Sequence, residues 1–429
     1  MPRELIDLIA PTERALLIGA PRKGRIARHR TAEHLEELAR LADTAGAEVV
    51  GEVVQQIERP NPATYLGKGK VDELTQTIAD KDATLLLFDD ELSPSQGKNI
   101  EDITGKRVMD RAELILDIFA TRARSAEAKM QVELAQLQYM LPRLTRMWAH
   151  LEKFRGGIGV RGPGETQLET DRRLINHRIK VLMQRLTEVQ KSREVQRGSR
   201  RGEFQASLVG YTNAGKSSIL RALSSDPTVF VENRLFATLD PLTREVELAD
   251  GEYILLTDTV GFVRKLPHQL VASFRATLEE VLEADVLLHV IDVSDNLWEE
   301  HRAVVVDVLS ELGANHKPVI NVFNKSDLLA PDELEAVRQR VTNLIPDAVF
   351  ASSEVEGGLD ALRRALLRRL RAERRVVDLR VPISDGRLLA ELHRNGDVLA
   401  QRTDGDEMIV SVRLTPEALG RLGARAIAV

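Results

Sequence analysis

One short segment combines residue types that suit phosphate chemistry at a fixed spacing, Gly-x-x-x-x-Gly-Lys-Ser, and its fixed positions are Gly210, Gly215, Lys216 and Ser217. An apolar stretch, 206–209, runs into it and a helical pattern follows, which is the context that a phosphate-binding loop requires. Glycines let successive backbone N–H groups approach an anion at a helix N-terminus. Lys216 supplies positive charge to the β- and γ-phosphates, and the Ser217 hydroxyl is a hard oxygen ligand for Mg²⁺. The segment therefore predicts a nucleoside triphosphate site.

Two further positions have the chemistry to hold a metal ion and sense the γ-phosphate. Asp258 begins the sequence Asp-Thr-Val-Gly after the apolar stretch 253–257, where a carboxylate holds Mg²⁺ through water and the N–H of Gly261 reaches the γ-phosphate. Thr238 lies between these motifs, where a threonine ligates Mg²⁺ as a first switch, although an ordinary threonine at a strand start is the alternative. We predict Lys216, Thr238 and Gly261 as catalytic residues. The predicted Mg²⁺ ligands are Ser217, Thr238 and Asp258.

A third motif selects the base. The sequence Asn324-Lys325-Ser-Asp327 follows the apolar stretch 319–323. The Asp327 carboxylate only accepts hydrogen bonds, and guanine presents N1–H and N2–H₂ donors that adenine lacks. Discrimination should be steep, because a carboxylate left without those donors is costly. The motif therefore predicts a site for GTP and GDP.

The loop 352–354, Ser-Ser-Glu, follows the next predicted strand and is placed to contact guanine O6. In this order the motifs predict a GTPase, against the alternative of a degenerate site that binds no nucleotide. The predicted nucleotide-contacting residues are Gly210, Tyr211, Thr212, Asn213, Ala214, Gly215, Lys216, Ser217, Ser218, Phe236, Ala237, Thr238, Asp258, Thr259, Val260, Gly261, Asn324, Lys325, Asp327, Ser352, Ser353 and Glu354.

One residue departs from the usual GTPase pattern. Phe262 follows Gly261, where Ras-like GTPases place the glutamine that orients the attacking water. Phenylalanine cannot orient water, so we predict slow intrinsic hydrolysis that a partner accelerates. His268 is an alternative for that task, but the sequence favours a surface histidine at a helix start. For His289 the sequence favours a core strand residue over a ligand.

These residues must be positioned by several domains, since 429 residues suffice for about three. The fold class that we predict is α/β multidomain, with a P-loop GTPase domain built on a doubly wound, mostly parallel sheet. The predicted parts are an α/β module at 1–124, a helical hairpin at 125–197, a linker at 198–202, the GTP-binding domain at 203–371 and a small α+β domain at 376–429. In the last part we predict strand, helix, strand, strand and helix.

The hairpin is predicted from two apolar seams with heptad spacing, one from Met130 to Leu151 and one from Ile175 to Val189. A glycine-rich stretch, 154–164, separates the seams and predicts the loop of an antiparallel pair. Pro142 should kink or split the first helix. The seams alone do not decide whether they pair within one chain or between two chains.

Charge is distributed unevenly. The net charge is −6, but residues 141–201 hold 15 Lys and Arg against 6 Asp and Glu, a local +9. Such an arm favours a polyanionic partner, although a solvated helical surface is the commoner meaning. The absence of cysteine excludes disulfides and fits a reducing cytosol. Neither a signal peptide nor a membrane-length apolar run occurs, so we expect a cytoplasmic protein without membrane insertion.

The chain resembles the HflX family of translational GTPases over essentially its full length. Two segments look like signatures of that family: Asn-Pro-Ala-Thr-Tyr-Leu-Gly-Lys-Gly-Lys-Val-Asp-Glu-Leu at 61–74 and Gly-Gly-Ile-Gly-Val-Arg-Gly-Pro-Gly-Glu-Thr-Gln-Leu-Glu-Thr-Asp at 156–171. The sequences Phe-Ala-Thr-Leu-Asp at 236–240 and Asp-Thr-Val-Gly-Phe-Val at 258–263 are also similar to it. The loop 352–354 departs from the pattern, in which Ser-Ala is commoner, and this departure puts its contact with the base in doubt.

The resemblance implies functions that the residues alone do not. Members bind the large ribosomal subunit, which stimulates their GTPase activity, and they split stalled or idle ribosomes under stress. The N-terminal module and hairpin would contact ribosomal RNA, with the glycine-rich loop reaching toward the peptidyl-transferase region. Some members also use ATP through the N-terminal part. We expect Mg²⁺ and GTP or GDP as ligands, no DNA partner, and a monomer.

Two other functions stay open at this point. One is a GTP-regulated interaction module that dimerises through the hairpin and has no ribosomal partner. The other is an ATP-dependent RNA-remodelling protein, whose activity would survive Lys216→Ala. Nothing in residues 376–429 carries recognisable chemistry, so no role is predicted there.

Overall fold

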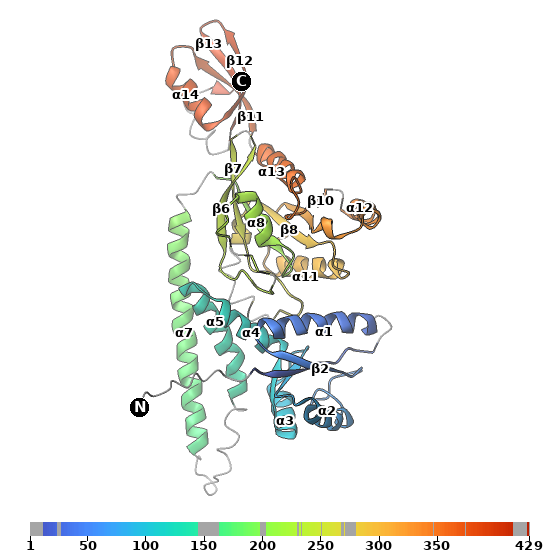
Figure 1. Cartoon of the computed structure of the whole chain (residues 1–429). Helices are drawn as coiled ribbons and strands as arrows, with labels where there is room; N and C mark the ends of the chain where they lie inside the picture. The colour runs from blue at the N-terminus through green and yellow to red at the C-terminus, as the bar shows by residue number, and fades with distance from the viewer. Residues whose placement is uncertain are drawn as a thin grey trace, which may run out of the picture.

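The computed structural model confirms an α/β multidomain fold and places a helical hairpin along one side of it (Figure 1). No described helix is long and apolar enough to cross a membrane. The described residues are 12–23, 27–144, 163–197, 203–229, 231–232, 234–249, 251–266, 270, 280–345, 347–373, 375–414 and 427–428.

The N-terminal domain is a four-stranded parallel sheet in the order β2-β1-β3-β4. Successive residues of β1 point to opposite faces, so Leu17 packs under α1 and α4 while Leu16 packs under α2 and α3. Both faces are therefore covered, as a parallel sheet requires. The elements are β1 Arg14–Gly19, α1 Ala27–Thr44, β2 Glu48–Val54, α2 Lys68–Lys81, β3 Leu85–Phe88, α3 Pro94–Thr104, β4 Arg107–Asp110 and α4 Arg111–Arg122.

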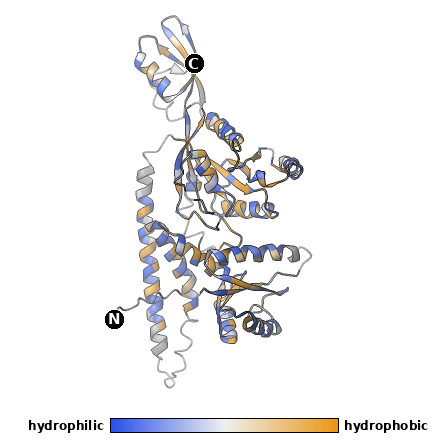
Figure 2. Ribbon diagram, viewed as in Figure 1, coloured by the Kyte–Doolittle hydropathy of each residue, from blue (hydrophilic) through white to orange (hydrophobic). Residues whose placement is uncertain are grey.

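The hairpin consists of α5 (Ala126–Met140) and α7 (Pro163–Arg197). The two seams pair within the chain through Leu134, Leu182 and Leu186, whereas the rest of α7 is mostly hydrophilic (Figure 2). The first helix ends at Met140, and Pro142 lies in the short 3₁₀ helix η1 (Leu141–Arg143), as its missing N–H dictates. Most of the predicted loop lies outside the described residues, but α7 begins at Pro163, inside the range predicted as loop, because proline suits a first helical position.

The third domain has a six-stranded sheet in the order β10-β9-β8-β5-β7-β6, in which only β6 is antiparallel to its neighbour among the described strands. Helices α8 and α13 pack on one face and α11 on the other. Its elements are β5 Gln205–Gly210, α8 Lys216–Ser224, β6 Leu242–Ala249, β7 Glu252–Asp258, β8 Val286–Asp292, α11 Trp298–Glu311, β9 Val319–Asn324, η3 Ser326–Leu328, α12 Pro331–Leu344, β10 Val349–Phe350 and α13 Asp360–Glu373.

The C-terminal domain is a small sheet in the order β12-β13-β11-β14, packed on α14. It lies at the opposite end of the molecule from the N-terminal sheet (Figure 1). Its elements are β11 Arg375–Pro382, α14 Gly386–Asn395, β12 Asp397–Asp404, β13 Glu407–Leu414 and β14 Ile427–Ala428. The final predicted helix falls on 415–426, which lie outside the described residues, and the sequence analysis missed β14.

Candidate nucleotide site

The phosphate loop connects β5 to α8, and two close approaches explain its glycines. A Cβ on Gly215 would lie 2.2 Å from Asn324 Nδ2, and the residue has φ +94°. A Cβ on Gly210 would lie 2.3 Å from the carbonyl oxygen of Val290. Asn324 Nδ2 donates a hydrogen bond to the Ala214 carbonyl at 2.9 Å, so the base-recognition motif supports the loop directly. A side chain at position 210 would displace the backbone of β8, and one at position 215 would displace the Asn324 side chain and be strained at this φ.

Lys216 is held beneath the loop. Its side chain is buried, and Nζ donates to the carbonyl oxygens of Tyr211 at 2.9 Å and Gly210 at 3.3 Å. Burial lowers the pKa of Lys216 to about 8, which the nearby carboxylate of Asp258 partly opposes. The ammonium is thus fixed at the start of α8, where an anion is favoured by the N–H groups of the helix.

Three oxygen-bearing side chains from three segments converge beside Lys216. Ser217 Oγ lies 2.8 Å from Thr238 Oγ1 and donates to Asp258 Oδ2 at 2.5 Å. Asp258 is 1% exposed, burial raises its pKa, and its Oδ1 has no hydrogen-bond partner among the described residues. A buried carboxylate oxygen without a partner beside two hydroxyls fits a hard cation such as Mg²⁺, which prefers oxygen ligands.

The base end is assembled by two loops that bind each other. Both the N–H and the Oγ of Ser326 donate to the Ala351 carbonyl, at 3.2 and 2.9 Å, and bring the loop that begins at Ser352 beside the Asn324 motif. Lys325 Nζ contacts Asp292 Oδ2 at 2.6 Å. Asp327 is exposed, so its carboxylate is open to a base. The two predicted base-contacting segments are therefore neighbours.

A cavity of about 250 Å³ lies along these segments. The predicted residues that line it are Thr212, Asn213, Gly215, Lys216, Ser217, Ser218, Phe236, Ala237, Thr238, Thr259, Gly261, Lys325 and Glu354. Those that do not line it are Gly210, Tyr211, Ala214, Asp258, Val260, Asn324, Asp327, Ser352 and Ser353. Val231, Glu232 and Arg234 also line it, and no motif marks them in the sequence.

Several predicted residues point their side chains away from the nucleotide. Thr259 Oγ1 donates to the Leu208 carbonyl at 2.6 Å, and Val260 and Phe236 are buried in an apolar cluster. The Tyr211 hydroxyl donates to Glu37 Oε1 in the N-terminal domain at 2.5 Å. These four side chains serve packing or the domain junction, so any nucleotide contact at these positions would have to come from the backbone.

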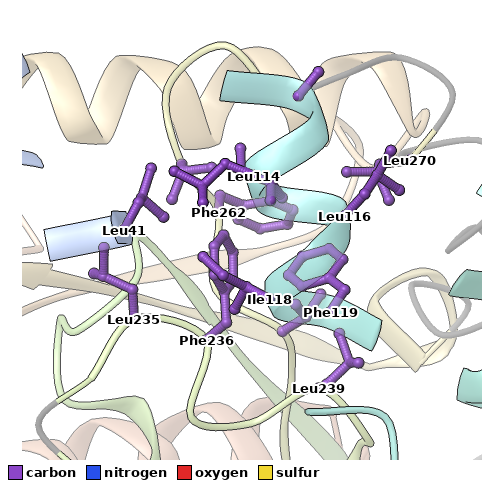
Figure 3. Close-up of a cluster of buried hydrophobic side chains, with 14 of the residues drawn as sticks. Leu41, Leu114, Leu116, Ile118, Phe119, Leu235, Phe236, Leu239, Phe262 and Leu270 are labelled. Atoms are coloured by element: carbon purple, nitrogen blue, oxygen red, sulfur yellow. The ribbon is translucent and has the colours of Figure 1, made fainter. Parts of the chain in front are cut away.

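The Phe262 side chain is sealed in an apolar cluster that spans both domains (Figure 3). It is 1% exposed and lies among Leu114 of α4, Leu41 of α1 and Phe236. Phe119 and Phe236 meet edge to face, with ring centroids 4.6 Å apart. The position that holds a water-orienting glutamine in Ras-like proteins is therefore part of a buried apolar core.

Beside this cluster, the segment after Phe262 binds the N-terminal domain through charge. Asp89, at the end of β3, contacts Lys265 at 2.7 Å, Arg111 at 2.9 Å and Arg264 at 3.2 Å. Burial acts to raise the pKa of Asp89, but the three cations hold it well below its usual range. Arg111 is 1% exposed and also contacts Glu37 at 2.8 Å.

Family models match three consecutive parts of the chain. Residues 32–120 match a model described as "GTP-binding GTPase N-terminal" and 122–200 match "GTP-binding GTPase Middle Region". Residues 205–325 match "50S ribosome-binding GTPase". The matched regions follow the N-terminal sheet, the hairpin and the nucleotide domain in order.

Curated relatives match nearly the whole chain. A GTPase HflX from Caldanaerobacter subterraneus subsp. tengcongensis is 45% identical over 97% of this chain and 94% of its own, and that of Escherichia coli is 44% identical over 84% and 85%. A solved complex of a protein named SsGBP with GDP covers 83% of this chain and 98% of its own at 27% identity, with a TM-score of 0.46. On these identities and the three matching models, the chain belongs to the HflX family and is a GTP-hydrolysing enzyme.

Proposed function

We propose that the protein is a ribosome-activated GTP switch that binds the large ribosomal subunit and dissociates or rescues stalled or idle ribosomes. The observation that carries the proposal is the burial of Phe262 in the domain junction. It leaves the site complete for nucleotide binding but without a water-orienting side chain at the Ras-like position. Intrinsic hydrolysis would then be slow, and the description "50S ribosome-binding GTPase" of a matching family model supports the ribosome as the partner that would accelerate it.

Within this function, the converging oxygen groups of Ser217, Thr238 and Asp258 would hold Mg²⁺ on the nucleotide phosphates. Asp327 would accept the N1–H and N2–H₂ groups of guanine. Lys216 would neutralise the β- and γ-phosphates from its buried position. The metal supplies charge neutralisation between the phosphates, while these residues orient the nucleotide.

The hairpin would provide the RNA contact. On α7, Arg172, Arg173, Lys180 and Arg185 are exposed while the apolar seam faces α5. Because the seams pair within the chain, the hairpin is already formed without a second copy, which favours a monomer over the hairpin-dimerised module. Lysine and arginine on such an arm bind phosphates with strong salt dependence and little sequence preference.

The direct test is the GTPase rate of the purified protein with and without large ribosomal subunits. We expect at least a tenfold increase in kcat with subunits and little change with free small subunits. An equally high GTPase rate without subunits would contradict the proposal, because the lack of a water-orienting side chain at position 262 would then not limit hydrolysis. Dissociation is tested by sedimenting intact ribosomes with a non-hydrolysable GTP analogue, where subunits should separate.

The RNA contact is tested by the double substitution Arg172→Ala and Arg173→Ala. We expect weaker subunit binding and a shallower dependence of log affinity on log salt, by about 1.5 to 2 in slope. The matched control is Arg364→Ala with Arg368→Ala, which removes the same charge from the exposed face of α13. Equal losses in both pairs would mean a general charge effect. The tip arginines Arg155 and Arg161 lie outside the described residues.

A further inference from the structure

Tyr211, the second residue of the phosphate loop, has a side chain that none of the phosphate chemistry uses. Its ring is 7% exposed and stacks on His301 of α11, with centroids 3.9 Å apart and planes 12° apart. Its hydroxyl donates to Glu37 Oε1 at 2.5 Å and accepts a hydrogen bond from the backbone N–H of Arg264 at 2.8 Å. A phenolic hydroxyl has one proton to donate, so both of these contacts are defined.

The same segment is also bound to the loop through its backbone. Thr212 N donates to the Phe262 carbonyl at 2.8 Å, and Phe262 N donates to the Gly210 carbonyl at 3.1 Å. Together with the bond from Arg264 N to the tyrosine hydroxyl, residues 262–264 are fixed at both ends. These three hydrogen bonds connect the phosphate loop to the segment that follows Gly261.

Gly261 directly precedes the hydrogen-bonded residues 262–264 and lines the nucleotide cavity. A Cβ on Gly261 would lie 2.8 Å from Thr212 Cα and 3.1 Å from Lys216 Nζ. Its backbone therefore borders the buried ammonium and lines the nucleotide cavity. A small shift of residues 262–264 would move this N–H relative to a bound phosphate.

We propose that Tyr211 is a positioning residue for the γ-phosphate: its hydroxyl holds the 261–264 backbone so that the Gly261 N–H faces the terminal phosphate of GTP. The proposal rests on the nucleotide contacts proposed above. GDP has no group at that place, so Tyr211 contributes to GTP binding and not to GDP binding. Because Glu37 orients the hydroxyl, the N-terminal domain sets the strength of this one contact.

The variant Tyr211→Phe tests it, because it keeps the ring stacked on His301 and removes only the hydroxyl. We expect the affinity for a non-hydrolysable GTP analogue with Mg²⁺ to fall about threefold to tenfold, as expected for one hydrogen bond, with the affinity for GDP unchanged. The matched control is Tyr253→Phe on β7, whose side chain is 48% exposed. A parallel fall for both nucleotides would indicate a structural role only, and unchanged affinity for both would overturn the proposal outright.

A double-mutant cycle tests the link to the N-terminal domain. Glu37→Gln keeps an oxygen acceptor but removes the charge, and it also weakens the contact with Arg111, so its single effect mixes two causes. The cycle with Tyr211→Phe isolates the shared term. We expect the loss of affinity for the analogue in the double variant to be smaller than the sum of the two single losses, and additive losses would overturn the role of Glu37. Loss of all nucleotide binding by the wild-type protein would instead reject the proposed site itself.

Discussion

A parallel sheet and a mostly parallel sheet have carboxyl ends that meet at one junction, yet in the described part of the chain only the second leads into a phosphate loop. In the nucleotide domain, β5 ends at Gly210 and continues into the loop and the N-terminus of α8. In the N-terminal domain, β3 ends next to Asp89, which binds Arg264 and Lys265 of the other domain. The carboxyl ends of strands are the usual place for a ligand in both architectures, so the difference lies in the loops.

The loops differ in what they do with polar groups. The nucleotide domain leaves an oxygen of Asp258 without a hydrogen-bond partner among the described residues, near a cavity that Lys216 and Ser217 line. The N-terminal sheet satisfies its carboxylates: Asp110 accepts hydrogen bonds from the N–H groups of Leu92 and Glu113 and contacts Arg143. The carboxylate oxygen without a partner favours the nucleotide edge as the one that binds a cation, whereas the paired carboxylate of Asp89 holds the two domains together.

The largest expected effect comes from the charge at the centre of the nucleotide sheet. Lys216→Ala removes the buried ammonium, and we expect GTP hydrolysis to fall at least 100-fold, in the range found for loss of one transition-state donor. Asp89→Ala, at the corresponding edge of the other sheet, removes one of the two carboxylates that pair with the buried Arg111, so it should lower stability while GTP hydrolysis remains measurable. Multiple-turnover phosphate release measures GTP hydrolysis by both variants, and urea unfolding measures the stability of Asp89→Ala. Survival of activity in Lys216→Ala would reverse the comparison and favour a nucleotide site on the N-terminal sheet.

A second test concerns the residue that links the two edges. Phe262→Gln places an amide among apolar side chains that offer it no hydrogen-bond partner. We therefore expect the free energy of unfolding to fall by about 3 kcal/mol. Partner-free hydrolysis should not rise toward that of Ras-like enzymes, because the local fold is built for an apolar side chain. Single-turnover hydrolysis and urea unfolding check this, with Phe262→Leu as the apolar control. A large gain in turnover would show that the missing glutamine alone limits the rate.

Sequence reasoning located the nucleotide edge because phosphate chemistry restricts residue types: glycine at close approaches and lysine and serine at the helix start. It located the hairpin because heptad spacing is a local pattern, and it placed the break at Pro142 for the same reason. The contacts between the N-terminal domain and the nucleotide domain were not predicted from the sequence. Asp89 and Arg264 are 175 residues apart, and no periodicity or spacing links them. The direction of the Tyr211 side chain was not predicted either, because Glu37 and His301 set that direction only in the folded chain.

A third test uses a polar group that is buried in the nucleotide sheet without a role in binding. His289 on β8 is 1% exposed, and burial lowers its pKa to about 3. Below pH 6.5 this histidine is protonated in the unfolded chain but stays neutral in the folded chain. The free energy of unfolding therefore decreases as the pH is lowered from about 6.5 to 3. We expect His289→Leu to lose less stability than wild type between pH 7 and pH 5, by ~2 kcal/mol. Urea unfolding at both pH values measures this, and identical losses would contradict it.

The smallest expected effect contrasts charge at the junction with charge on the hairpin. Arg178 and Glu133 form a two-point ion pair at 2.6 and 2.8 Å, geometrically as close as the contacts of Asp89, but both side chains are well exposed. Water and salt screen such a pair, so Arg178→Ala should leave the urea midpoint unchanged. Leu182→Ala, in the fully buried seam one turn away, should cost about 3 kcal/mol. A urea midpoint that falls in Arg178→Ala, and falls less in high salt, would mean that charge stabilises the hairpin as it does the junction. Burial would then no longer explain why the two regions differ.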